Sequence, residues 1–281
     1  MKKTTEIKTC RYTILFLLGA MILTGCGKTV GDIELELPEG EALAMVWIEP
    51  GAFLINKDGP QSEVHLTDDG EFTVTFSDEK GPQTEVLIPE GYWLGATPVT
   101  QGQWEAIMGR NPSHFQSSGQ NAPVENVSWD EAMEFCRKLT ERERRAGRLP
   151  EGYAYTLPSE EQWEYAARAG TTTRWWFGNS ESDLRRHAWY DANSDGRTHA
   201  VGQKGANPWG LYDVHGNVWE WTRSSPRTGF EDSDTDTSMR ALRGGCLSSS
   251  AGFTSSDFFI GHPPDHRGIS LGFRLALAPS P

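Results

Sequence analysis

Two histidines near the C-terminus have the spacing of metal ligands. His262 and His266 are four residues apart, which would place both imidazoles on one face of an α-helix, as in helical zinc sites. Pro263 and Pro264 lie between them, and proline inside a helix removes a backbone hydrogen bond and clashes with the preceding turn. The pattern therefore argues against zinc and favours two loop histidines.

Two acidic segments carry part of a calcium-loop pattern. Asp191, Asn193 and Asp195 alternate as in the first half of an EF-hand, but the twelfth position of that loop is Gly202 instead of Glu. Residues 231–237 (EDSDTDT) alternate carboxylates without the Gly and Glu that such a loop needs. We interpret the first segment as an Asn/Gly turn and the second as a solvated acidic loop.

The chain has four cysteines, of which two remain candidates for chemistry. Cys10 and Cys26 belong to the N-terminal segment described below. Cys136 lies on the apolar face of a predicted helix and is expected to be a buried small hydrophobe. Cys246 has no His or Lys beside it in the sequence to activate its thiol, so we interpret it as a small loop residue. One disulfide can form at most, so we expect the core to rest on aromatic burial.

The segment that follows residue 245 has a rigid frame and an unusual filling. Arg-Gly-Gly at 243–245 precedes it and Gly-Phe-Arg at 272–274 follows it. Residues 246–271 contain no Lys, Glu, Gln, Met or Trp, although these five types make up about a fifth of the chain. They are the amino acids that cannot be encoded when the first two bases of an Asn codon are randomised. Targeted mutagenesis and a chance bias of a Ser/Gly/Phe-rich loop both explain the gap.

The N-terminus has the pattern of a bacterial signal peptide. Four basic residues precede an apolar run over residues 14–23, which is too short to span a bilayer as a helix. The run ends in Leu-Thr-Gly-Cys, which resembles the lipoprotein cleavage box and implies cleavage before Cys26 and a diacylglycerol on its thiol. The alternative is a plain secretory peptide. We predict a signal peptide over residues 1–25 and a lipid-anchored envelope protein, on the outer membrane and exposed at the surface.

The net charge limits the partners. The formal net charge is −13, and removal of the basic N-terminus makes the chain more acidic. Such a chain is not attracted to nucleic acid or to anionic lipid, so we expect no nucleic-acid partner. No later segment is long and apolar enough to span a membrane. The expected membrane contact is therefore the lipid on Cys26.

The rest of the chain must hold the frame in place. Residues 26–43 are acidic and lack the turn residues of a packed unit, so we expect a tether before a domain over residues 44–281. Residues 44–55 predict two short strands around a Pro-Gly turn. Alternating segments within residues 57–90 are separated by Gly-containing turns and predict β-hairpins.

Two capping boxes predict the two main helices. Ser128 with Glu131, and Ser159 with Gln162, have the spacing at which a hydroxyl and a carboxylate or amide satisfy the first backbone N–H groups of a helix. We expect these helices to end near residues 146 and 169, each before a glycine.

Little other regular structure is predicted. Thr100 is expected to cap a shorter helix over residues 101–108. After Gly170 the chain is rich in Gly, Asn and Trp, and no long helix is visible. We therefore expect one α+β domain with two main helices, short β-strands and much irregular loop.

Six motifs in order carry a resemblance to a known family. They are PVT at 98–100, PVENVSW at 123–129, LPSEEQWEYAAR at 157–168, GLYDVHGNVWEW at 210–221, RGG at 243–245 and GFR at 272–274. Over about residues 44–277 they resemble the formylglycine-generating enzyme (sulfatase-modifying factor) family. The resemblance implies a C-type-lectin-like fold.

The resemblance fails at the residues that carry the oxidase chemistry. The enzyme has cysteines at the fourth and ninth positions after Gly-Gly, where this chain has Ser249 and Thr254. Hydroxyls do not serve as copper-binding thiolates or redox partners. The iron-dependent sulfoxide synthases of the family need a separate His-rich helical domain, which this sequence lacks. We therefore expect no enzyme activity.

The resemblance also implies one structural calcium site. Asp213 and Glu220 would supply carboxylates, and Gly216 and Val218 would supply backbone carbonyls, a set of hard oxygen ligands that suits calcium. The alternative is that these polar groups accept hydrogen bonds from the backbone amides of the loop and bind no metal. No cofactor is otherwise required.

Within the family, the chain resembles the variable proteins of diversity-generating retroelements, of the treponeme type. These keep the frame and vary the residues inside it by adenine mutagenesis. Pro-Asp-His-Arg at 264–267 resembles their Pro-Asp-Asn-Arg pattern. The resemblance implies a lectin-like scaffold that binds a protein or cell-surface ligand through residues 246–271, here named the display loop.

The display loop mixes aromatic and small polar residues, as antibody contact loops do. The predicted apolar contacts are Leu247, Phe253, Phe258, Phe259 and Ile269. The predicted polar contacts are Ser248, Ser249, Ser255, Asp257, His262 and His266. Two rival hypotheses stay open, a formylglycine-generating-type oxidase that acts through Cys246 and a purely structural envelope lipoprotein.

Overall fold

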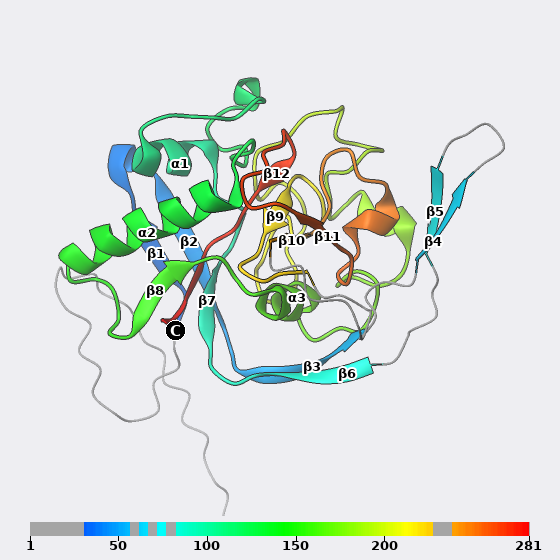
Figure 1. Cartoon of the computed structure of the whole chain (residues 1–281), viewed down its shortest axis with the longest axis horizontal. Helices are drawn as coiled ribbons and strands as arrows, with labels where there is room; N and C mark the ends of the chain where they lie inside the picture. The colour runs from blue at the N-terminus through cyan, green and yellow to red at the C-terminus, as the bar shows by residue number, and fades with distance from the viewer. Residues whose placement is uncertain (1–30, 57–61, 67–71, 77–82, 227–237, 281) are drawn as a thin grey trace, which may run out of the picture.

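The computed structural model describes residues 31–56, 62–66, 72–76, 83–226 and 238–280 (Figure 1). The predicted signal peptide, the predicted lipidation site Cys26 and the predicted acidic loop at 231–237 lie outside these residues. Among the described helices, none combines the length and the apolar character that a bilayer crossing requires.

A five-stranded sheet joins the two ends of the domain. Its order is β1 (Ile33–Glu36), β2 (Ala42–Ile48), β7 (Tyr92–Gly95), β13 (Ala276–Pro279) and β8 (Tyr153–Thr156). All neighbours are antiparallel, and β13 lies between β7 and β8, with Ala276 opposite both Leu94 and Thr156. The last strand of the chain therefore occupies an interior position in the sheet.

The predicted tether is wrong from Ile33 onward. Residues 33–36 form β1, a short 3₁₀ helix η1 follows at Pro38–Gly40, and the side chains of Leu35, Leu37 and Leu43 are buried in the core. The alternation of apolar residues with glutamates in this stretch is the pattern of a half-buried strand. Its acidic composition masked that pattern.

The helices begin where the capping residues predict. They are α1 (Gln101–Met108), α2 (Trp129–Arg145), α3 (Glu160–Arg168) and the short α4 (Glu181–Leu184). Ser128 Oγ accepts from Glu131 N at 3.2 Å, and Ser159 Oγ accepts from Gln162 N at 3.1 Å. Thr100 caps α1 in the same way. Each cap satisfies an N–H group that the helix itself leaves unpaired.

A second sheet carries the frame of the display loop. Its order is β11 (Phe259–His262), β10 (Arg240–Arg243), β9 (Trp219–Trp221) and β12 (Leu271–Gly272), with β12 parallel to β9 and the other pairs antiparallel. The display loop leaves β10, passes through the 3₁₀ helix η3 (Ala251–Thr254), returns as β11 and ends in β12. Both ends of the loop are therefore held by one sheet.

Two ribbons extend from the domain. β3 (Gly51–Asn56) pairs with β6 (Gln83–Ile88), and β4 (Ser62–Leu66) pairs with β5 (Phe72–Phe76), both antiparallel. Figure 1 shows the β3–β6 ribbon running beside α3, with the β4–β5 ribbon beyond its end. Hairpins were predicted in this region, and the structure adds that β6 pairs back to β3.

The core is aromatic, as the composition predicts. Trp104, Phe135 and Phe273 pack with ring centroids 5.5–5.9 Å apart, and all three are fully buried. Cys136 and Cys246 are both free and buried, and burial raises the pKa of the Cys136 thiol. The mixture of a few helices with many short strands confirms the predicted α+β class.

Candidate binding face

Arg243 holds the display loop from inside. Its side chain is fully buried, with Nη2 2.6 Å from Glu164 Oε2 and 3.2 Å from Glu160 Oε1, both on α3. Nη1 donates to the backbone carbonyl oxygens of Ser256 and Phe258, at 3.2 Å each. A buried charge is stable only when it is paired, so this geometry ties the middle of the loop to α3.

Arg274 holds the other end of the frame. Nε and Nη2 donate to the two carboxylate oxygens of Glu220, at 2.8 Å each, and Trp163 Nε1 donates to the same carboxylate at 2.6 Å. The guanidinium also donates to the carbonyl oxygens of Gly95 and Tyr212, at 2.8 Å each. This bidentate pair is almost fully excluded from solvent.

The two frame glycines leave no room for a side chain. Gly245 has φ +74°, and a Cβ there would lie 2.9 Å from Phe253 O and 3.0 Å from Thr254 Cα. Gly244 has φ +92°, and its Cβ would lie 3.1 Å from Val214 O. Both backbone conformations are ones that glycine adopts without strain. Both positions therefore disfavour any residue larger than glycine.

The first part of the display loop packs on a turn from the middle of the chain. Asp191 N donates to Ser249 O at 3.1 Å, and Ser194 Oγ donates to Leu247 O at 2.6 Å. The turn is built by Asn193, whose side chain accepts from Tyr190 N at 2.9 Å. The interpretation of this segment as an Asn turn is therefore confirmed, and the turn supports the loop.

The structure divides the eleven predicted contacts into two groups. Leu247, Ser249, Ser255 and Phe258 are buried, so their side chains support the loop and do not reach a ligand in this conformation. Seven stay accessible: Ser248, His266 and Ile269 are exposed, and Phe253, Asp257, Phe259 and His262 are half-buried. Ile269 is a large apolar residue with 48% of its surface exposed. The candidate face therefore narrows to these seven residues.

Asn56 is a neighbour of this face that the sequence did not predict. Its Nδ2 donates to Asp257 Oδ2 at 2.9 Å, while Ser255 Oγ donates to Asp257 Oδ1 at 2.8 Å. Asn56 lies at the end of β3, and 201 residues separate it from Asp257. Such a long-range contact leaves no local signal in the sequence.

The two loop histidines meet without a helix. His262 and His266 stack with ring centroids 4.3 Å apart and planes 13° apart. A metal lies in the plane of each imidazole that binds it, so two parallel stacked rings do not converge on one ion. No group of three or more His, Cys, Asp or Glu suited to a metal occurs in the described ranges. Burial, with a smaller effect from His266, lowers the pKa of His262.

Comparison with known proteins identifies the family. The Sulfatase-modifying factor enzyme 1-like domain matches residues 35–279. The chain belongs to this family.

Three similar proteins illustrate the range of the family. Treponema denticola variable protein 1 superposes with a TM-score of 0.70 at 29% identity, over 88% of this chain and 99% of that one. Inactive C-alpha-formylglycine-generating enzyme 2 of Mus musculus is 28% identical, over 86% of this chain and 88% of its own length. The formylglycine-generating enzyme of Thermomonospora curvata is 29% identical, over 70% and 68%. Membership of the family therefore does not decide whether a chain is an enzyme.

The two positions that are cysteine in the active enzymes of the family hold structural hydroxyls here. Ser249 Oγ accepts from Cys246 N at 3.0 Å. Thr254 Oγ1 accepts from Trp175 Nε1 at 3.0 Å and donates to Ala251 O at 2.7 Å. Both hydroxyls hold the loop backbone or a core tryptophan in place. Through these hydrogen bonds, Ser249 and Thr254 have a structural role in the loop.

The hydrogen-bond partners that the structure describes for the Cys246 thiol are hydroxyl groups. Its Sγ lies 3.3 Å from Ser248 Oγ and 3.4 Å from Ser249 Oγ, and the side chain is buried. Thiol activation needs a neighbouring cation or base, and hydroxyl groups supply neither. The interpretation of Cys246 as a small loop residue fits this geometry.

The predicted calcium ligands do not assemble as a set of free oxygens. Both oxygens of Glu220 accept from Arg274, whose positive charge opposes a second cation there. Asp213 is different, because Oδ2 accepts from Gly202 N at 2.7 Å while Oδ1 is buried without a partner among the described residues. Burial is the main cause that raises the pKa of Asp213 to about 6. One carboxylate of the expected set, and not two, is available to a cation.

Proposed function

We propose that this protein is a non-enzymatic binding protein of the cell envelope that presents the accessible residues of the display loop to a protein or cell-surface ligand. The lipid on Cys26 would hold it at the outer membrane with the domain facing outward. No nucleic acid takes part, and no cofactor is needed beyond one possible structural calcium ion.

The main support for this proposal is the contrast between the buried frame and the accessible residues of the display loop. Arg243 and Arg274 are fully buried and paired with carboxylates, whereas seven of the predicted contact residues between them keep accessible side chains. Such a construction lets the accessible residues change at little cost to folding, because surface substitutions usually change stability by less than about 0.5 kcal/mol. Similarity to Treponema denticola variable protein 1 over 88% of the chain supports the same reading.

The absence of enzyme activity is part of the proposal. Ser249 and Thr254 stand at the enzyme's cysteine positions and are used in packing. We expect the purified protein to bind no copper at these positions and to leave a cysteine-containing peptide unoxidised in the presence of oxygen. Turnover of such a peptide that depends on Cys246 would replace this proposal by the oxidase hypothesis.

The decisive test of variation is genetic. We expect a reverse transcriptase gene near this one, together with an adenine-rich template copy of codons 246–271. Sequences from independent isolates should then differ at accessible positions such as Ser248 and Asp257 and agree at the frame. A locus without the template, with identical codons in every isolate, would leave a structural envelope lipoprotein as the better explanation.

A further inference from the structure

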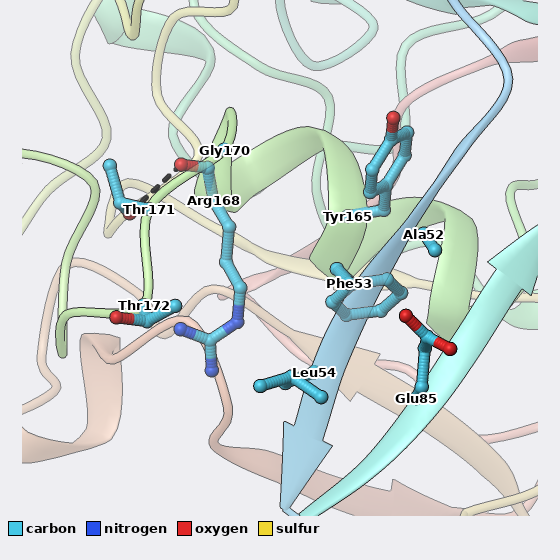
Figure 2. Close-up of a pocket in the computed structure, with 9 residues that line it drawn as sticks. All are labelled: Ala52, Phe53, Leu54, Glu85, Tyr165, Arg168, Gly170, Thr171 and Thr172. Carbon is cyan, nitrogen blue, oxygen red and sulfur yellow. Dashed lines mark hydrogen bonds between the residues drawn. The ribbon is translucent and has the colours of Figure 1, made fainter.

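A shallow hollow of about 240 Å³ lies between the β3–β6 ribbon and the turn that follows α3 (Figure 2). Phe53, Leu54 and Glu85 line it from the ribbon, and Tyr165, Arg168 and Thr172 line it from α3 and the turn. Within the described residues β3 pairs only with β6, so its other edge is free to border this hollow.

Both walls of the hollow lead to the display loop. On the ribbon side, Asn56 donates to Asp257, and Asn56 is two residues beyond Leu54. On the other side, Ser256 N donates to Arg174 O at 2.8 Å, and Arg174 is two residues beyond Thr172. Two residues of an extended strand span about 7 Å, so the ribbon side of the hollow approaches the candidate face at Asp257.

The charge of the hollow comes from Glu85. Arg168 is compensated, because Nε and Nη2 lie 2.9 and 2.8 Å from Glu164 Oε1. Glu164 also pairs with Arg243, which pairs in turn with Glu160, so this cluster contains two guanidinium groups and two carboxylates. Glu85 is exposed, and no Lys or Arg of the described segments pairs with it.

Apart from Arg168 and the turn residues 170–172, the remaining lining is apolar and aromatic. Phe53 and Tyr165 lie with ring centroids 5.5 Å apart, and Leu54 leaves 43% of its surface exposed at the rim. Figure 2 shows Glu85 on one side of the Phe53 ring and Leu54 with Arg168 on the other. A long side chain with an apolar stem and a cationic end matches this combination, because the stem covers apolar surface while the cation meets a carboxylate and aromatic faces.

We propose that this hollow accepts a lysine or arginine side chain of the protein ligand and acts as a fixed contact beside the display loop. The inference rests on the proposed binding function and names part of the ligand's chemistry. All lining residues lie outside residues 246–271, so the contact stays the same when the loop changes. The net charge of −13 favours a basic partner in the same sense.

The test uses small probes and the full-length protein. Nα-acetyl-lysine amide and Nα-acetyl-arginine amide are titrated by NMR, with Nα-acetyl-norleucine amide as the uncharged control. We expect dissociation constants on the order of 1 mM, from the usual affinity per atom of small ligands. The shifts should centre on Leu54, Glu85 and Thr172.

Variants separate the hollow from a general attraction to acidic surface. Glu85→Gln should weaken lysine-amide binding about two- to five-fold, the range of an exposed ion pair. Glu90→Gln, a matched change at an exposed glutamate outside the hollow, should leave it unchanged. Equal binding of the norleucine amide, or equal effects of the two variants, overturns the proposal.

A third variant keeps this proposal distinct from the proposed function. Replacement of Ser248, Phe253 and Phe259 by other small or aromatic residues changes the display loop and leaves the hollow intact. The probes should bind this variant as they bind the parent. If the loop variant no longer binds the probes, then the probes bind to the display loop. That result would refute the hollow as a contact and leave the proposed binding function of the loop intact.

Discussion

Replacement of Arg274 by methionine would test whether the buried frame holds the display loop. The change keeps a long side chain but removes the four hydrogen bonds to Glu220, Gly95 and Tyr212. Among the described residues, it leaves the Glu220 carboxylate, which is 1% exposed, with Trp163 Nε1 as its remaining donor. Breaking a buried pair in this way costs about 3–5 kcal/mol.

That cost should be visible in a melting experiment. A domain of this size loses about 2–4 °C of Tm per kcal/mol, so we expect Arg274→Met to lower Tm by roughly 6–20 °C. Thermal and urea unfolding followed by tryptophan fluorescence measure the effect. The matched control is Arg267→Met, because Arg267 also pairs with a glutamate, Glu131 at 2.9 Å, but is 53% exposed. An exposed pair contributes about 0–1 kcal/mol.

A double variant identifies the cause. Glu220→Gln together with Arg274→Met removes both charges, so its loss of stability should be smaller than the sum of the two single losses. If Arg274→Met melts within about 2 °C of the parent, or no lower than Arg267→Met, then the buried pair does not hold the frame and the argument from it is wrong.

The other predictions concern the loop, the buried aspartate and the anchor. Replacement of Ser248, Phe253, Asp257, Phe259 and His262 together by other small or aromatic residues should leave Tm nearly unchanged, whereas Phe273→Ala should cost roughly 3–5 kcal/mol; equal sensitivity in thermal melts would show that the loop is packed structure. The raised pKa of Asp213 means that, between about pH 4 and pH 6, the native state binds a proton that the unfolded chain has already lost. The free energy of unfolding should therefore fall by up to about 3 kcal/mol as pH rises through this window. Asp213→Asn should remove this fall and stabilise the protein at pH 7; if a cation neutralises Asp213 instead, chelation should lower the parent's Tm and the variant should lose stability. Cys26→Ser should move the protein from the membrane fraction to the soluble fraction, and a variant that still requires detergent for extraction would refute the lipid anchor.

The parts of the fold that local chemistry decides were predictable. Ser128 and Ser159 predict the starts of α2 and α3 because each capping contact joins residues only three positions apart in the sequence. β1 was missed because four glutamates between residues 34 and 41 outweighed its short apolar alternation.

The candidate face depended on contacts that no local pattern records. Leu247 and Phe258 are indistinguishable in type from accessible loop residues, and their burial is decided by distant segments such as the 190–194 turn. The pairing of Arg243 with Glu164 joins residues 79 positions apart. The sequence therefore predicted where the loop begins and ends, and the structure was needed to divide its residues into supports and contacts.

Because β13 lies in the interior of the sheet, the domain can fold only if translation continues in frame through the display loop. β13 follows the display loop in the sequence, and it fills the place between β7 and β8. A chain that stops or shifts reading frame within residues 246–271 lacks Phe273, Arg274 and this strand. Its sheet would be left with two unpaired interior edges, which favours aggregation and degradation over a folded state. If the display loop varies as proposed, a stop or frameshift inside it would abolish folding as well as binding, and such versions would not persist as stable protein.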